Sequence, residues 1–177
     1  GIGGFAIKSE TAKIVEHFLH GGTGSVSHLL SQPEFLPDKF EPGTPNMLGI
    51  IGLGSSIDFI LSEGISKIYS HELMLAKRFL KGIEDERIIV YGHNCIDKIT
   101  PVISLNIKGM DNGVLSETLE DEFGISTRSG LHCSPICHRT IGTYPEGTLR
   151  VSFGYFNTAD EIDYCVDCIK KILKRIS

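Results

Sequence analysis

The sequence predicts an α/β chain whose C-terminal part is a small α+β domain, a sheet with helices covering it. Residues 101–107 and 148–153 alternate apolar and polar side chains, which is typical of strands with one buried face. Residues 158–176 open with a capping box, Thr158 and Glu161, which predicts the start of an amphipathic helix. The apolar residues of this helix recur every three or four positions, at Ile162, Cys165, Val166, Ile169, Ile172, Leu173 and Ile176.

The first part of the chain carries weaker signals. Residues 5–7 suggest a short buried strand, and residues 11–20 have apolar side chains at helical spacing. The glycine-rich turn at 21–25 lacks the lysine and the spacing of a P-loop, so a plain connector is favoured over a phosphate site. Two prolines exclude a regular helix from residues 31–40, which we expect to form an extended loop.

An apolar helix is expected to begin at Pro45 and to end near Leu61. Thr44 before Pro45 is typical of an N-cap followed by proline at the first helical position. Such a helix start also attracts anions, so Thr44 is open to a second reading as a ligand contact. The helix would be weak alone and needs a closely packed neighbour, because it contains Gly49, Gly52 and Gly54.

A domain boundary is predicted after this helix, at Glu63 and Gly64, so that residues 1–63 and 64–177 form separate parts. The second part has its own alternating pattern of helices and strands. Before the strand at 148–153, its expected elements are a helix at 65–80, strands at 87–91 and 101–107, a helix at 112–123, and a strand or loop at 125–128.

Composition excludes several classes of function. The chain is 41% hydrophobic and 22% charged with a net charge of −5, so it offers no basic footprint for nucleic acid. No apolar run approaches the roughly 18–20 residues of a membrane span, and we expect a cytoplasmic protein. The five cysteines are an odd number and are expected to be reduced thiols. The chain begins at Gly1, in the middle of what resembles a loop entering a strand, which suggests a fragment.

The strongest candidate for chemistry is the cysteine loop, residues 127–135, with the sequence TRSGLHCSP. A thiol attacks as its thiolate, which cationic or polar neighbours favour. Arg128 and His132 are such neighbours of Cys133 in sequence, and Gly130 permits backbone angles that other residues avoid. An inert thiol is the alternative interpretation.

Arg150 is the second candidate, because it shares a face of its predicted strand with Ser152. A planar guanidinium binds a carboxylate through two hydrogen bonds, which suits an amino-acid substrate. A surface salt bridge would explain the arginine equally well.

A metal site is the less favoured use of the cysteines. Cys133, Cys137 and His138, together with Cys165 and Cys168, give a superficially adequate set of zinc ligands. Cys165, however, falls on the apolar face of the last predicted helix, where a cysteine packs as a small hydrophobic residue. We therefore predict no metal ligands.

Three segments resemble the class V PLP-dependent aminotransferase-like family, in its cysteine desulfurase and selenocysteine lyase branch. FEPGTPN at 40–46 resembles the signature F-E-x-G-T-P-N, and RSGLHC at 128–133 resembles R-x-G-x-H-C. TLRVSFGYFNT at 148–158 is similar to the arginine strand that follows in those enzymes. The resemblance implies the C-terminal part of a fold type I, aspartate aminotransferase-like enzyme. Residues 1–63 would be the tail of the large PLP-binding domain with its linking helix, and 64–177 the small domain carrying the catalytic cysteine.

The resemblance also implies roles for individual residues. Cys133 matches the catalytic cysteine, whose thiolate takes sulfur from L-cysteine or selenium from selenocysteine; with cysteine, a persulfide and alanine result. Arg150 matches the arginine that holds the substrate α-carboxylate, and Arg128 and His132 line the substrate site. Thr44 matches the threonine that contacts the pyridoxal 5'-phosphate of the neighbouring subunit, which implies a homodimer. A sulfur-acceptor protein is a further expected partner.

The chain departs from the family pattern in two respects. The cofactor-anchoring lysine of the family precedes the segment that matches Gly1, so residues 1–177 alone are expected to be inactive. Cys137 adds a second thiol, which leaves open which cysteine carries the persulfide. Another class V enzyme, or a non-catalytic zinc-binding or dimerisation module, remains an alternative to the desulfurase.

Overall fold

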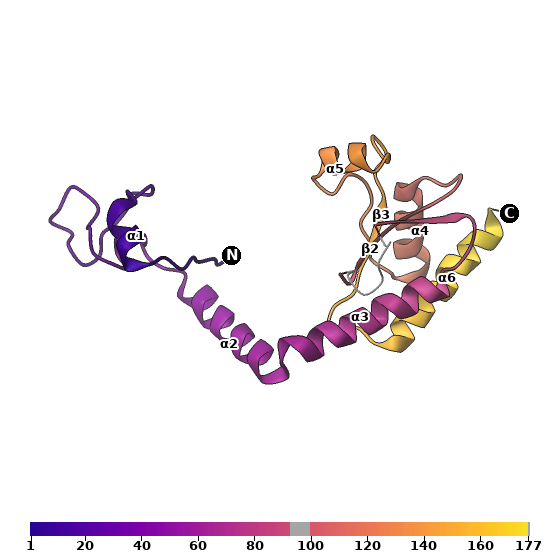
Figure 1. Cartoon of the computed structure of the whole chain (residues 1–177), viewed down its shortest axis with the longest axis horizontal. Helices are drawn as coiled ribbons and strands as arrows, with labels where there is room; N and C mark the ends of the chain where they lie inside the picture. Colours follow the sequence, from indigo (N-terminus) through magenta and orange to yellow (C-terminus); the bar gives the residue numbers. More distant parts are fainter. Residues whose placement is uncertain (93–99, 177) are drawn as a thin grey trace. The chain divides into compact units, whose positions relative to one another are not determined.

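The computed structural model describes residues 1–92 and 100–176 (Figure 1). The chain divides into two compact units, Gly1–Glu63 and Gly64–Ser177. Four cysteines within the described residues are free thiols, at Cys133, Cys137, Cys165 and Cys168. Cys95, the fifth cysteine of the sequence, lies outside the described residues.

The first unit contains two helices, α1 (Ser9–Ile14) and α2 (Met47–Glu63), joined by a long loop. The strand predicted at 5–7 is wrong, since these residues form no strand and Phe5 is 60% exposed. No strand of this unit lies within the described residues to pair with it, and an unpaired strand is not stable. The helix expected at 11–20 is present but begins earlier and ends at Ile14. The loop predicted at 31–40 is confirmed.

The predicted cap of α2 is wrong. The backbone N–H of Gly49 donates to the side-chain oxygen of Asn46 at 2.9 Å, so Asn46 caps the helix and Thr44 does not. Asparagine is at least as good a cap as threonine, and the Asn46 amide also donates to the carbonyl of Gly1 at 3.0 Å. Thr44 is exposed in the preceding loop and makes no hydrogen bond with the described residues.

Helix α2 has no buried residue. Gly49 lies close to Asn46 and Ile2, but a Cβ added at Gly52 or Gly54 would meet no atom within 4 Å, so the described residues do not supply the close packing expected at these two glycines. No single helix among the described residues is long and apolar enough to cross a membrane. Helices α2 and α3 (Ile65–Gly82) reach the length and apolar composition of a membrane span only when they are counted together.

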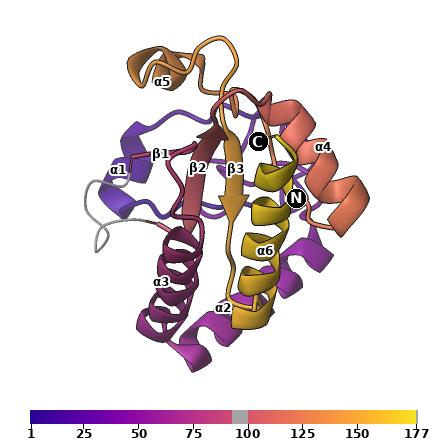
Figure 2. The same cartoon turned by 90° about the vertical axis from the view of Figure 1, so that its right-hand side faces the viewer.

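The second unit is a three-stranded antiparallel sheet in the order β1 (Ile88–Tyr91), β2 (Val102–Ile107) and β3 (Leu149–Ser152) (Figure 2). The helices predicted near 65–80, 112–123 and 158–176 are confirmed as α3, α4 (Asn112–Phe123) and α6 (Ala159–Arg175). The predicted capping box of α6 is also present. A short helix, α5 (Pro135–Thr140), was not predicted, because six residues are too few for a periodic pattern.

The core lies on one face of the sheet, between the strands and helices α3, α4 and α6. Alternate residues of β2 and β3 point into it, as the alternation of side chains predicts. Cys165 is buried in α6 as expected, whereas Ile176 follows the helix and is 42% exposed, so its predicted burial is wrong. The largest fully buried side chains are Phe79, Leu75, Leu105, Leu115, Leu119, Leu149, Ile169 and Ile172. The opposite face of the sheet carries Ser104, Asn106 and Arg150 together with the exposed apolar side chains of Ile89 and Val102.

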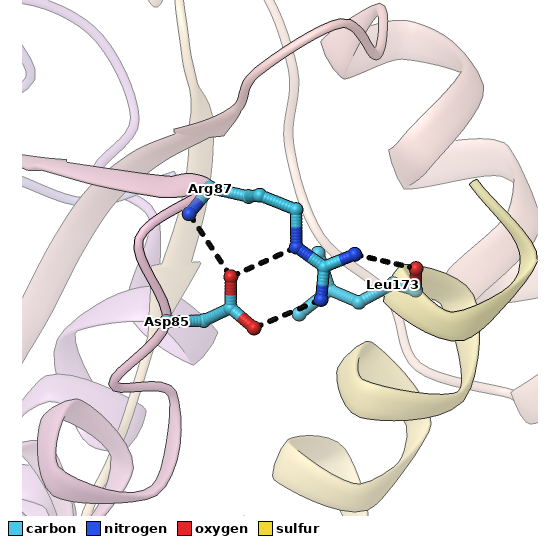
Figure 3. A network of polar contacts seen from close by, with 3 residues as sticks. All are labelled: Asp85, Arg87 and Leu173. Carbon is cyan, nitrogen blue, oxygen red and sulfur yellow. Dashed lines mark hydrogen bonds and ion pairs between the residues drawn. The ribbon is translucent and has the colours of Figure 1, made fainter. Parts of the chain in front are cut away.

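A polar network fastens β1 to the last turn of α6 (Figure 3). Arg87 donates through Nε and Nη2 to the two carboxylate oxygens of Asp85, each at 2.9 Å. Its Nη1 donates to the carbonyl of Leu173 at 2.9 Å. These hydrogen bonds from Arg87 lower the pKa of Asp85 to about 2.

We expect Asp85→Asn to lower the melting temperature at pH 7. The folded state favours the Asp85 carboxylate, so its contribution is present above the unfolded pKa of about 4 and is lost as the pH falls toward 2. Melting curves of the two proteins from pH 7 downward should therefore converge in acid. Glu84→Gln removes an exposed neighbouring charge that acts on neither Asp85 nor Arg87 and serves as the control. A melting difference that does not change with pH would contradict the assignment.

Candidate active site

The cysteine loop is paired with β3 through its backbone. The N–H of Arg128 donates to the carbonyl of Arg150 at 3.2 Å, and the N–H of Arg150 donates to the carbonyl of Arg128 at 2.7 Å. Residues that face each other in such an antiparallel pair place their side chains on the same face. The pairing therefore places both arginines on the face of the sheet opposite the core.

A close approach of two glycines fixes the next part of the loop. The N–H of Thr148 donates to the carbonyl of Gly130 at 3.1 Å. Gly147 has φ +80°, and a Cβ atom there would lie 2.2 Å from the carbonyl carbon of Gly130. Only a residue without a side chain fits between the two backbones, so Gly147 sets the position of the loop.

Asn112 holds the loop from the other side. It is buried at the start of α4, where its side-chain oxygen accepts from the N–H of Gly130 at 3.1 Å. Its amide nitrogen donates to the carbonyl of Glu146 at 3.2 Å. Asn112 and Gly147 were not predicted as site residues, because their roles depend on contacts between distant segments. The glycine itself, just before the strand of Arg150, was the available signal.

Cys133 is exposed and adopts a left-handed backbone conformation with φ 61°, directly after His132 with φ 49°. Two such residues in a row cost about 1–2 kcal/mol each when they are not glycine. Arg128 Nη2 lies 3.6 Å from Cys133 Sγ. A cationic donor is therefore placed at an accessible thiol.

His132 is turned away from this role. Its Nε2 lies 3.0 Å from the carbonyl of Thr148, and because a carbonyl only accepts, Nε2 must donate. Burial lowers the pKa of His132 despite this hydrogen bond, and the nearby charges of Arg150 and Arg128 lower it further. The ring is consequently neutral at pH 7. Of the two neighbours expected from the sequence, the contact to the Cys133 thiol is made by Arg128.

Arg150 is half-buried on β3, and its Nε is buried without a hydrogen-bond partner among residues 1–92 and 100–176. A buried guanidinium N–H without an acceptor is costly, and a carboxylate would satisfy it. Arg150 thus fits the binding of an acidic group beside the cysteine loop.

The predicted site residues divide between the two units of the chain. Cys133, Arg128, His132 and Arg150 all belong to the second unit, whereas Thr44 belongs to the first. Within the described residues, no group of three or more His, Cys, Asp and Glu is placed to hold a metal ion. Cys165 and Cys168 are buried in the core, while Cys133 and Cys137 are exposed.

We predict that Gly147→Ala displaces the cysteine loop and destabilises the protein by roughly 2–4 kcal/mol, through collision with Gly130 and backbone strain. Gly142→Ala is the matched control, since Gly142 has φ +75° but no atom within 4 Å of the added Cβ. The control should carry backbone strain alone, about 1–2 kcal/mol. Urea unfolding measures both, and equal losses would contradict the close approach.

We predict that Arg128→Met slows the alkylation of Cys133 by iodoacetamide at pH 7 about two- to fivefold, the scale of an exposed charge contact. The rate is followed by mass spectrometry of the peptide that contains Cys133. Arg139→Met is the control, because the Arg139 guanidinium lies over the Tyr144 ring, 4.6 Å from its centroid. Equal effects of the two variants would remove the special role of Arg128.

Comparison of the sequence with known proteins identifies a family for this chain. The family model described as Aminotransferase class-V matches residues 1–165. A probable cysteine desulfurase from Pyrococcus abyssi is 33% identical over 99% of this chain and 44% of its own length. One from Borreliella burgdorferi is 33% identical over 80% of this chain and 33% of its own. The chain therefore spans less than half the length of these relatives.

Solved structures agree with the sequence comparison. The cysteine desulfurase CsdA from Escherichia coli matches with a TM-score of 0.78 and 26% identity, over 94% of this chain and 41% of that one. An apo cysteine desulfurase from Thermococcus onnurineus matches with a TM-score of 0.73 and 32% identity, over 78% and 34%. The prediction of a partial fold type I chain is confirmed. The chain belongs to the class-V aminotransferase family, and these relatives are cysteine desulfurases.

Proposed function

We propose that residues 1–177 belong to a PLP-dependent cysteine desulfurase in which Cys133 accepts the sulfur of L-cysteine. The observation that carries this proposal is the placement of Arg128 Nη2 at 3.6 Å from the Cys133 thiol, on a loop paired with the strand of Arg150. A nucleophile, a cation in contact with it and a carboxylate-binding group are thereby assembled together. The named activity of the relatives supports the same assignment.

The cofactor would be held in part by this chain. Class-V aminotransferases are PLP-dependent, and PLP supplies an electron sink for chemistry at an amino-acid carbon. The exposed Thr44 hydroxyl makes no hydrogen bond with the described residues, so it fits a phosphate oxygen as acceptor. We assign it that role in a homodimer, as the resemblance implies.

The residues of the second unit would perform three tasks. Arg150 binds the substrate α-carboxylate through its guanidinium, whose Nε has no partner among the described residues, and so orients the amino acid. Arg128 lies at the thiol of Cys133, whose sulfur attacks the substrate sulfur. A sulfur–sulfur bond forms as the carbon–sulfur bond breaks, and protonation of the carbon fragment yields alanine. The persulfide remains on an exposed loop, where an acceptor protein can collect it.

We predict that Cys133→Ser in the full-length enzyme lowers alanine release from L-cysteine by at least about a hundredfold, because the hydroxyl cannot accept sulfur. Cys137→Ser is the matched control, since Cys137 is also an exposed thiol and lies four residues further on. It should keep its rate within about twofold. Alanine and sulfide are measured together. Undiminished release from the Cys133 variant would remove this residue from the mechanism.

A further inference from the structure

A short segment, residues 147–149, lies between β2 and the cysteine loop. The backbone register of β2 with β3 ends at the pair formed by Leu105 and Leu149. The next residue of β2, Asn106, continues the contact through its side chain. Its Nδ2 donates to the carbonyl of Gly147 at 3.0 Å, and its Oδ1 accepts from the N–H of Leu149 at 3.3 Å.

An amide side chain suits this position. In an extended segment, the carbonyl of one residue and the N–H of the residue two further on point to the same side. The Asn106 side chain offers a donor and an acceptor in one plane, so it pairs with both of these groups. Because the Gly147 carbonyl only accepts and the Leu149 N–H only donates, the Asn106 amide has one possible orientation.

Thr148, the middle residue of the segment, presents its own backbone to the cysteine loop. It is fully buried, its N–H donates to the carbonyl of Gly130 at 3.1 Å, and its carbonyl accepts from His132 Nε2 at 3.0 Å. Gly147 is packed directly against Gly130 as well. The segment is thus held by Asn106 on one side and holds the loop on the other.

We propose that Asn106 is a positioning residue for Cys133. It sets the distance of residues 147–149 from β2, and the segment in turn fixes Gly130 and His132, which precede the thiol. Both the oxygen and the nitrogen of the Asn106 amide bind backbone groups. Asn106 therefore acts through the segment and the loop, and it is assigned no contact with substrate.

Arg150 is held in a different way. It lies within the ladder of β2 and β3, opposite Ser104, and its backbone pairs with that of Arg128. Loss of the Asn106 amide should therefore leave the carboxylate-binding arginine in place while the loop that carries the thiol shifts. The consequence for sulfur transfer rests on the proposed function, whereas the consequence for the loop does not.

The kinetic test is Asn106→Ala in the full-length enzyme, with alanine release measured over a range of L-cysteine concentrations. We expect kcat to fall about ten- to a hundredfold, the scale for a reacting group displaced by about 1 Å. KM should stay nearly unchanged, because Arg150 keeps its place. A folded Asn106→Ala enzyme with an unchanged kcat, or one in which KM alone rises, would overturn the proposal.

Thr158→Ala is the control for lost stability. The Thr158 hydroxyl accepts from the N–H of Glu161 and caps α6, so this variant removes one side-chain contact to the backbone elsewhere in the second unit. It should keep both kcat and KM. An equal fall of kcat in the two variants would mean that stability alone is responsible, and the positioning role would be lost.

Hydrogen exchange in the same proteins gives a readout that is independent of PLP and of L-cysteine. The Thr148 amide is the critical one, because it binds Gly130 and not Asn106. It should lose protection in Asn106→Ala, whereas the amides paired between β2 and β3 should keep theirs. Unchanged protection of Thr148, or an equal loss at all these amides, would contradict the proposal.

Asn106→Asp provides a second variant of nearly the same shape. Its carboxylate can still accept from the Leu149 N–H, but the second oxygen has no proton to donate to the Gly147 carbonyl. Should Asn106→Ala fail to fold, both measurements are made on Asn106→Asp, and an unchanged kcat or unchanged Thr148 protection overturns the proposal.

The two readouts separate this proposal from the proposed function. If Cys133→Ser left alanine release intact while Asn106→Ala exposed the Thr148 amide, the proposed function would fail and the positioning of the loop would stand. Loss of release in Cys133→Ser together with unchanged exchange in Asn106→Ala would sink the positioning role alone.

Discussion

The pairing of the cysteine loop with β3 is the constraint on which the candidate site depends. Backbone hydrogen bonds join Arg128 to Arg150 in both directions and Thr148 to Gly130. Each such bond contributes about 0.5–1.5 kcal/mol, so together they are comparable with the cost of two left-handed residues in the loop. The first part of the loop, from Arg128 to Gly130, is thus an extension of the sheet, and it places Cys133 three residues beyond this paired segment.

The two faces of the sheet have different roles in the second unit: one forms the core and the other presents Arg150. One face is covered by α3, α4 and α6 and supplies the buried area that makes the strands stable. The other face is not covered by these helices, and it carries Arg150 beside the loop. Because alternate residues of one strand point to opposite faces, the burial of Leu149 and Val151 and the presentation of Arg150 have the same cause.

The sequence predicted the parts of the fold that have a strong local pattern. The strand of Arg150 and the capped helix α6 were recognised from alternation, spacing and a capping box. The strand at 5–7 and the Thr44 cap were wrong, because the first depends on a partner strand and the second on competition with Asn46. The local sequence specifies neither the presence of a partner strand nor which of two polar residues caps the helix.

For the site, the sequence identified the reactive groups but not the elements that position them. The resemblance to a known family identified Cys133 and Arg128 as site residues. The residues around them, Gly147, Asn112 and Asn106, could be recognised only from contacts between distant segments. Hydrogen exchange in the full-length protein tests the pairing most directly. The amides of Arg128, Thr148 and Arg150 should exchange as slowly as those paired between β2 and β3. Exchange at the rate of an open surface loop would contradict a thiol held by the sheet.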